Sequence, residues 1–379
     1  MNKTIIENPF AFGGTVKGRQ FIDREKERAE LIQDIENHAN LVLYAPRRYG
    51  KSSLILQVFE DIKKTNTKFI GLYIDFFKIH SREKFLQILS NEYSKNSGWS
   101  ADKIISFFKS VISSVQPSLT LNNEGQPELN MMFGSQMHFD SFEEIMNLPQ
   151  KLAEKGYVVC VVFDEFQEII RLNGNDFQRE LRSVIQHHSN VSYIFCGSKQ
   201  HLISQIFSVS ESPLYNIGKM KYINKILEEK FVPYIRKNIK SVLEGFTIAS
   251  GREVYRNANG VPYYVQMLAY ELFNFGLMNP DVDPELLIEK SVKKIVSEKS
   301  EEYLIIYEGF SPSVKKILEM VISTDGTNMF SQKNLANFNI PGSTLRKGLT
   351  ILSDKGILTQ TENVYSFPDV FFQKWLECF

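Results

Sequence analysis

A Gly-Lys-Ser turn between a short apolar segment and an amphipathic one is the feature that most constrains how this chain folds. Residues 41–44, Leu-Val-Leu-Tyr, have the composition of a buried strand, and residues 53–63 have the apolar spacing of a helix. The sequence of residues 45–52, which join them, is Ala-Pro-Arg-Arg-Tyr-Gly-Lys-Ser. At the start of a helix, backbone N–H groups without a partner inside the helix can face an anion. The segment therefore predicts a phosphate-binding loop (P-loop) in a strand-loop-helix unit.

The residue types in this loop suit nucleotide phosphates. Gly50 lets the backbone approach a phosphate closely. Lys51 would contact the β- and γ-phosphates as a point charge, and the Ser52 hydroxyl would bind Mg²⁺. Ala45 stands where glycine usually opens the motif, and its small side chain fits if the position does not need a positive φ. A turn without a ligand is the alternative, and the strand-helix context argues against it. The residues predicted to bind the nucleotide here are Ala45, Pro46, Arg47, Arg48, Tyr49, Gly50, Lys51, Ser52 and Ser53.

A second candidate element is an apolar run that ends in two carboxylates, Val-Val-Phe-Asp-Glu at residues 161–165. If its strand lies beside the P-loop strand, Asp164 reaches the Mg²⁺ shell directly or through water. Glu165 could then polarise the attacking water as a general base. The alternative is an ordinary strand end with a solvated acidic pair. The P-loop upstream favours the functional interpretation.

A third candidate is Ser198, in the sequence Cys-Gly-Ser-Lys that follows the apolar residues 191–196. A polar side chain at this strand end would lie near the γ-phosphate and the water, where it could act as a sensor. A Gly-Ser turn that caps the next helix fits the sequence equally well.

The first two-thirds of the chain alternate apolar strands with amphipathic helices, which is typical of an α/β fold with a parallel sheet covered on both faces. A β-hairpin, near residues 117–133, is expected to interrupt this alternation. The expected strands are residues 41–44, 68–75, 157–163, 191–196 and, more weakly, 220–226, and the expected helices are 53–63, 81–115 and 176–188, with Asp176 as an N-cap.

The remaining third of the chain has a different pattern. Residues 1–227 are assigned to the α/β core, residues 228–306 to an all-helical domain, and residues 307–379 to a winged helix-turn-helix. The helical domain is expected to contain helices at 228–243, 263–275 and 284–304. The winged helix is expected to contain helices at 312–323, 331–338 and 343–355, the last capped by Ser343, and a wing of strands at 356–360 and 364–367.

Charge and targeting signals exclude some functions. Lys and Arg total 44 and Asp and Glu total 44, so the net charge of zero argues against a surface devoted to nucleic acid. Three widely spaced cysteines form no metal-binding or disulfide pattern, and the N-terminus has no apolar signal segment. The most apolar run, residues 157–163, is too short to cross a bilayer. We therefore expect a cytoplasmic protein without a membrane segment.

Taken together, these residues resemble the archaeal-type ATPase family, a STAND branch of the AAA+ P-loop ATPases. The resemblance runs from about Asn8 to the C-terminus. The motifs that carry it are Asn8-Pro-Phe, Phe21-Ile-Asp-Arg-Glu25, the P-loop with its opening Ala45, the pair Asp164-Glu165, the strand end Gly197-Ser198 and the helical-domain turn Asn259-Gly-Val-Pro-Tyr263.

The resemblance implies an ATP- and Mg²⁺-dependent switch. In the family, the N-terminal box with Phe21 and Arg24 lies against the adenine and ribose, and the Gly-x-Pro motif with Pro262 belongs to a helical lid. The implied catalytic residues are Glu165, Lys51 and Ser198, and the implied Mg²⁺ ligands are Ser52 and Asp164. The family usually carries an arginine close after residues 212–215, where this chain has Lys219. Arg179 and Arg182 are other candidates for an arginine finger, although a solvated helix face explains them better.

Two questions about function stay open. Residues 311–379 contain seven basic and six acidic side chains, a weak balance for binding DNA through the helix at 343–355. The favoured role for that domain is a protein-docking or autoinhibitory module packed on the ATPase core, and we expect a protein partner or self-association. The chain could also be a nucleotide-sensing scaffold that binds ATP with little turnover, although Glu165 argues against that interpretation.

Overall fold

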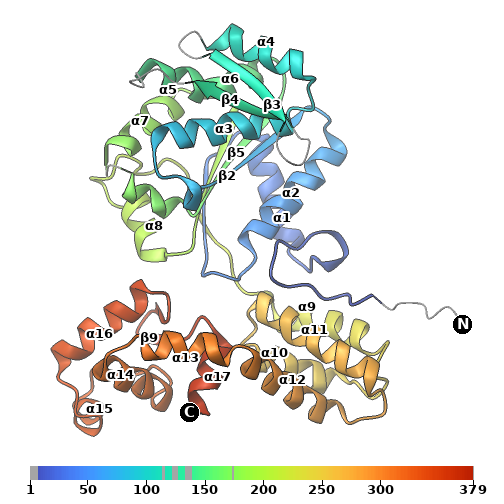
Figure 1. Cartoon of the computed structure of the whole chain (residues 1–379), viewed down its shortest axis with the longest axis vertical. Coiled ribbons are helices and arrows are strands. Elements are labelled where there is room, and N and C mark those ends of the chain that lie inside the picture. The colour runs from blue at the N-terminus through green and yellow to red at the C-terminus, as the bar shows by residue number, and fades with distance from the viewer. Residues whose placement is uncertain (1–6, 113–115, 122–126, 133–138, 173–174, 379) are drawn as a thin grey trace, which may run out of the picture. The chain divides into compact units, whose positions relative to one another are not determined.

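The computed structural model describes residues 7–112, 116–121, 127–132, 139–172 and 175–378. The chain forms two compact units. In Figure 1 one is coloured blue to yellow-green, and the other is coloured yellow to red, together with the dark blue residues 7–23. We call Arg24–Asn224 the sheet unit, and Met1–Asp23 with Lys225–Phe379 the helical unit. The division after residue 224 lies close to the predicted one after residue 227, whereas residues 7–23 group with the helical unit.

The sheet unit is built on five parallel strands, which confirms the predicted α/β class. The strand order is β2-β5-β6-β1-β7. The strands are β1 (Leu41–Tyr44), β2 (Phe69–Asp75), β5 (Val158–Asp164), β6 (Val191–Gly197) and β7 (Lys219–Tyr222). The expectation that the strand ending at Asp164 lies beside the P-loop strand is wrong, because β6 pairs with both β1 and β5 and separates them.

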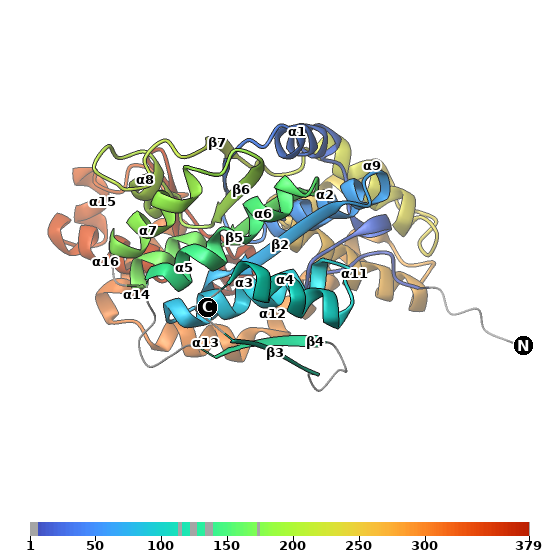
Figure 2. The ribbon, with the colours of Figure 1, turned by 90° about the horizontal axis from the view of Figure 1, so that it is seen from above.

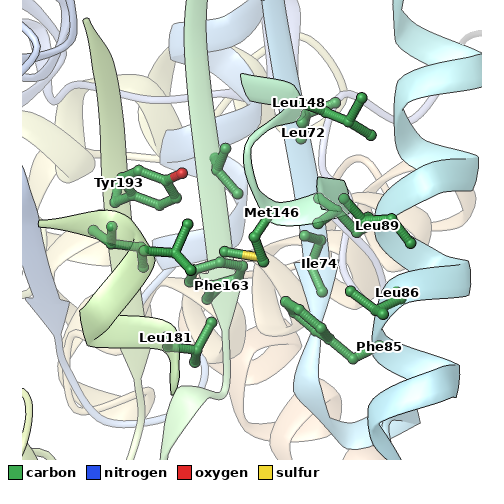
Figure 3. Close-up of a cluster of buried hydrophobic side chains, with 14 of the residues drawn as sticks. Leu72, Ile74, Phe85, Leu86, Leu89, Met146, Leu148, Phe163, Leu181 and Tyr193 are labelled. Atoms are coloured by element: carbon green, nitrogen blue, oxygen red, sulfur yellow. The ribbon is translucent and has the colours of Figure 1, made fainter. Parts of the chain in front are cut away.

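One face of the sheet carries the main hydrophobic core. Alternate side chains of each strand, such as Leu72 and Ile74 on β2 and Phe163 on β5, point to this face, as expected for the two-residue period of a strand. Figure 3 shows them packed against Phe85 and Leu89 of the helix α3. The helices that contribute to this core are α3 (Arg82–Asn96), α4 (Ala101–Val111), α5 (Phe139–Met146), α6 (Leu148–Glu154), α7 (Asn175–Ile185) and α8 (Gln200–Phe207).

The opposite face is covered by α1 (Glu25–Glu36) and α2 (Lys51–Thr65). On α2, the Phe59 ring packs edge-on against Phe69 of β2, with a centroid separation of 5.2 Å. A Cβ at Gly71 would lie 2.5 Å from the Phe59 ring. Glycine at this position therefore lets α2 approach the sheet.

The segment predicted as one helix at 81–115 forms two. Helix α3 ends at Asn96 and α4 begins at Ala101, because the intervening Ser100 is extended (φ −65°, ψ 156°). Residues 113–115 lie outside the described residues. Strands β3 (Gln116–Leu121) and β4 (Pro127–Met132) pair antiparallel and lie against α4 and α3 (Figure 2). This antiparallel pair is separate from the parallel sheet and lies where the hairpin is expected, near 117–133; residues 122–126 and 133 of that segment lie outside the described residues.

The first part of the helical unit contains α9 (Glu228–Ile239), α10 (Ile248–Asn257), α11 (Pro262–Met278), α12 (Pro284–Glu298) and α13 (Ser300–Glu308). Helix α10 is absent from the sequence prediction. Residues 7–23 pack onto this group: the Asn8 side chain donates to Asn274 Oδ1 at 2.9 Å, and Phe10 contacts Tyr234 edge-on. Among the described helices of the chain, none combines the length and the apolar character needed to cross a bilayer.

The C-terminal part consists of α14 (Pro312–Ser323), α15 (Gln332–Asn337), α16 (Gly342–Asp354), the antiparallel pair β8 (Thr359–Thr361) and β9 (Val364–Ser366), and α17 (Val370–Glu377). Ser331 caps α15 by accepting from the Asn334 N–H. Ser343 is not a cap, because α16 begins at Gly342 after an extended Pro341. Asp176 likewise lies inside α7 instead of capping it.

Candidate functional site

The Gly-Lys-Ser turn lies where the sequence predicts it, between β1 and α2. Gly50 is the N-cap residue of the fifteen-residue α2 and has a left-handed backbone, with φ 87°. Because glycine has no side chain, the N-cap residue makes no side-chain hydrogen bond to the amides of the first turn. At the other end of the loop, the Ala45 N–H donates to the Gly197 carbonyl at 3.3 Å. The loop is therefore tied to the end of β6.

Lys51 is buried inside the loop. Its ammonium group donates to the Ala45 carbonyl at 2.8 Å and lies 3.5 Å from the Pro46 carbonyl. Burial lowers the pKa of Lys51, and the nearby carboxylates of Glu165 and Asp164 partly oppose that effect. The loop thus encloses one cation close to two acidic side chains.

Asp164 is the centre of a hydrogen-bond network that includes the P-loop. The Ser52 hydroxyl donates to Asp164 Oδ2 at 3.0 Å, and the Tyr73 hydroxyl, from β2, donates to the same oxygen. The Glu165 N–H donates to Asp164 Oδ1 at 2.9 Å. Burial, followed by the charge of Asp164, raises the pKa of Tyr73, so its hydroxyl stays a donor. Asp164 is itself buried, and both of its oxygens accept hydrogen bonds.

The oxygens around Asp164 suit a magnesium ion. Mg²⁺ prefers oxygen ligands and usually takes one or two from the protein, with water and substrate phosphates completing its shell. The Ser52 hydroxyl and the Asp164 carboxylate are such a pair. Within the described residues, no cluster of three or more His, Cys, Asp or Glu side chains could hold a metal ion by itself. The donor set therefore fits an ion that is bound together with a nucleotide.

Glu165 projects from a strained backbone. Its φ of 49° lies in the left-handed region, which a non-glycine residue adopts uncommonly and often at functional sites. The Ser198 hydroxyl donates to Glu165 Oε2 at 2.6 Å, and Gln167 donates to the same oxygen. The N-cap residue of α8 is Lys199. The Ser198 side chain thus contacts Glu165, and its role as a sensor of the γ-phosphate stays a prediction.

Arg24 contacts the backbone of the P-loop. Its buried guanidinium donates through Nη2 to the carbonyls of Tyr49, at 2.9 Å, and of Asn224, at 2.8 Å. Through Nη1 it also pairs with Glu27 at 3.0 Å. The guanidinium thus supports the backbone of the P-loop. Contact between Arg24 and a nucleotide stays a prediction.

The other predicted nucleotide-binding residues have separate environments. Arg47 is exposed, and its guanidinium lies 5.4 Å from the centre of the Phe77 ring. Phe21 and Pro262 belong to the helical unit, where Pro262 is buried as the first residue of α11. Contact between these two residues and a nucleotide also stays a prediction.

The three candidates for an arginine-finger position make contacts within the sheet unit. Arg179 lies 3.5 Å from Asp176, Arg182 donates to the Tyr215 carbonyl at 3.1 Å, and Lys219 lies 4.0 Å from Asp34. These contacts fit the structural roles that the sequence favours for the two arginines.

Two residues of this site, Tyr73 and Gln167, are absent from the sequence prediction. Tyr73 lies within the predicted strand at 68–75, but only the pairing of β2 with β5 brings it opposite Val162, two residues before Asp164. Gln167 belongs to the 3-10 turn η3 (Phe166–Arg171) that follows the acidic pair. The signal that could have indicated Gln167 is a glutamine that follows the predicted acidic strand end within three residues.

Comparisons with known proteins find similarity to an ATPase family and to ATP-binding proteins. The sequence matches the family described as an ATPase domain predominantly from Archaea over residues 21–268, more than half of the chain. An uncharacterized ATP-binding protein of Pyrococcus horikoshii is 28% identical over 226 residues, which are 55% of this chain and 66% of that protein. A second, from Methanocaldococcus jannaschii, is 25% identical over 368 residues, which are 88% of this chain and 91% of that protein. This chain thus spans just under two-thirds of the first relative's length.

Solved structures share the architecture at low sequence identity. The Walker-type ATPase of Pyrococcus abyssi superposes with a TM-score of 0.66 and 20% identity, over 95% of this chain and 97% of that one. The ADP form of the ORC2 protein of Aeropyrum pernix gives a TM-score of 0.54 and 12% identity, over 95% of each chain. These likenesses show the fold alone, and that fold is the P-loop ATPase core that the sequence predicts.

Proposed function

Because the chain belongs to the family of ATPase domains found predominantly in Archaea, we propose that it binds ATP with Mg²⁺ and hydrolyses the terminal phosphate. The observation that carries this proposal is the meeting of four side chains at the carboxyl edge of the parallel sheet. Ser52 contacts Asp164, Lys51 lies near both carboxylates, and Glu165 follows directly in the chain. Ligands of open α/β sheets bind at this edge.

Each of these side chains has a role in the proposed reaction. Lys51 and the first amides of α2 bind the phosphates, and Ser52 and Asp164 hold the ion. When bound, Mg²⁺ supplies positive charge at the β- and γ-phosphates. Glu165 takes a proton from the attacking water as general base, while Ser198 contacts Glu165 and senses the terminal phosphate.

We also propose that the nucleotide switches the conformation of residues 228–306, as a helical lid, and of residues 307–379, as a winged helix-turn-helix. The order α14, α15, α16 and the pair β8–β9 supports the second assignment. A nucleotide can bias a two-state domain pair only if it binds the two states differently. Hydrogen exchange should therefore slow in residues 259–268 when ATP is added, and protection in residues 307–379 should change with it. Protection limited to the P-loop would contradict the switch and favour the scaffold.

The test of the enzymatic proposal is the Glu165→Gln substitution. The variant should bind a fluorescent ATP analogue like the wild type, because the side chain keeps its size. It should lose turnover by about 10²- to 10⁴-fold, the usual contribution of a general base. Glu168→Gln is the matched control: Glu168 is buried three residues away and pairs with Arg171 at 2.8 Å. Turnover should be measured with and without nucleic acid, since a trigger controls many switches of this kind.

The same assay addresses the remaining alternatives. A wild-type chain that binds ATP and never releases phosphate would be a nucleotide-sensing scaffold. Stimulation by DNA would indicate a DNA-binding ATPase. The near balance of charges in residues 311–379 favours a protein partner or self-association for that region. We also propose that the protein is cytoplasmic.

A further inference from the structure

Gln167 is a buried polar side chain at the acidic pair, with 2% of its surface exposed. Its amide nitrogen donates to Glu165 Oε2 and lies 3.4 Å from the Ser198 hydroxyl oxygen. A carboxylate only accepts hydrogen bonds, so the NH₂ group of the amide must face Glu165. Gln167 therefore belongs to the same hydrogen-bonded group as the proposed base and the proposed sensor.

The orientation that suits Glu165 leaves the other end of the amide unsatisfied. Gln167 Oε1 is buried and has no hydrogen-bond partner among the described residues. Gln167 Oε1 lies close to the backbone of β6, because a Cβ added at Gly197 would lie 2.7 Å from this oxygen. A buried acceptor without a partner lowers the free energy of unfolding. An apolar side chain of the same shape would suit this position better if stability alone mattered.

The hydrogen bonds to Glu165 are unevenly distributed. Ser198 and Gln167 both donate to Oε2, and within the described part of the chain no hydrogen bond reaches Oε1. Ser198 directly follows β6, whereas Gln167 belongs to η3. These two donors from different elements fix one oxygen of the carboxylate in place. The second oxygen is then held in one orientation while it stays able to accept a proton.

We propose that Gln167 is a positioning residue, which holds Glu165 Oε2 so that Oε1 receives the proton of the attacking water. The inference rests on the proposed hydrolysis. In that step the water gives one proton to Oε1, its oxygen bonds to the γ-phosphorus, and the bond from that phosphorus to the β–γ bridging oxygen breaks. ADP and inorganic phosphate leave, and Glu165 returns the proton to solvent.

The experiment replaces the amide by a side chain of the same shape without a donor. Gln167→Met should unfold at the wild-type temperature or above it, because the unsatisfied acceptor is gone. Its KM for ATP should not change, while kcat should fall by about 10- to 100-fold, the usual effect of a misplaced reacting group. Gln57→Leu is the control, since Gln57 is a buried amide of the same unit that donates to Asp61 instead.

A double-mutant cycle separates positioning from a structural role. Ser198→Ala and Gln167→Met should be non-additive in kcat, because both donors act on one oxygen. Additive losses in kcat would overturn the positioning role. A lower unfolding temperature together with equal losses in kcat and in ATP affinity would overturn it as well. If Gln167→Met does not fold, Gln167→Leu replaces it in the same cycle. Wild-type turnover retained in the folded variant overturns this role alone, whereas no turnover in the wild type overturns the proposed function as well.

Discussion

Ser52 and Asp164 form a hydrogen bond of 3.0 Å although strand β6 lies between β1, which precedes Ser52, and β5, which ends at Asp164. The reason is the path of α2, which joins β1 to β2 on the far side of β5. The helix must cross β6 and β5, so its first turn lies over their carboxyl ends. A hydroxyl from the first turn of the helix after β1 thus reaches a carboxylate that is two strands away.

The Ser52–Asp164 pair should control the dependence on Mg²⁺. Ser52→Ala and Asp164→Asn should each raise the Mg²⁺ concentration needed for half-maximal ATP binding, because each removes an oxygen ligand. In the double variant, the loss of binding free energy should be smaller than the sum of the losses in the two single variants, since the two side chains are in contact. The measurement is a Mg²⁺ titration of nucleotide binding. Thr65→Ala, at the last residue of α2, is the control. Strict additivity would show that the two side chains act at separate places.

Lys51→Ala should weaken ATP binding by about 10- to 100-fold. A hydrogen bond to a charged group is worth about 1.5–3 kcal/mol, and each 1.4 kcal/mol is about tenfold in affinity. Burial lowers the pKa of Lys51, which means that burying the charged ammonium group costs free energy. Removing this group should therefore not lower the unfolding temperature. Lys63→Ala, exposed in the last turn of α2, is the control. Unchanged affinity in a folded Lys51→Ala protein would refute the P-loop assignment.

His188 should make stability depend on pH. The imidazole lies 2.7 Å from the Tyr193 hydroxyl and 2.8 Å from Asn147 Oδ1, and burial followed by repulsion from His187 lowers its pKa from 6.5 to about 4. Between these values the unfolded chain binds a proton that the folded chain does not, so stability falls as pH falls through this range. The shift corresponds to about 3 kcal/mol.

The check is urea unfolding at pH 7, 5.5 and 4 for three proteins. His188→Gln should flatten the loss of stability relative to the wild type, because glutamine does not titrate. His187→Gln, at the exposed neighbouring position, should keep most of the loss. An identical pH dependence in His188→Gln and the wild type would assign the effect to other groups.

Gly71→Ala should destabilise the sheet unit by about 1–3 kcal/mol, the usual range for overpacking a core. The added Cβ would lie 2.5 Å from the Phe59 ring. Phe59→Leu in the same chain should recover part of the loss by making room. Gly14→Ala is the control, because a Cβ at Gly14 meets nothing within 4 Å. Thermal unfolding of the four proteins measures the effect, and equal unfolding temperatures would show that α2 moves freely.

The sequence predicts the local parts of this site well, because they depend on neighbouring residues. The strand, loop and helix around Gly50, and the acidic end of β5, follow from apolar runs and from residue types that bind phosphate and metal. Strand order depends on pairing between distant segments, so the separation of β1 from β5 cannot be predicted from local patterns. Helix α10 contains Gly251, which weakens the helical signal.

The contacts of the remaining site residues arise from tertiary structure. Ser198 could cap a helix or face Glu165, and only the position of β6 relative to β5 decides between these contacts. Gln167 reaches the acidic pair because Glu165 adopts a left-handed backbone before a 3-10 turn. Sequence periodicity does not indicate either conformation.

The place of Arg24 sets the length of the smallest fragment that could carry an intact loop. Arg24 is the first residue of the sheet unit, and one of its amino groups holds the carbonyl of Asn224, the last residue, together with that of Tyr49. A fragment cut after Tyr222, where the sheet ends, would remove the Asn224 carbonyl that this buried guanidinium contacts, and losing a hydrogen bond to a buried charged group is destabilising. A single side chain, and not the outline of the sheet, therefore fixes both ends of any truncated version of this unit.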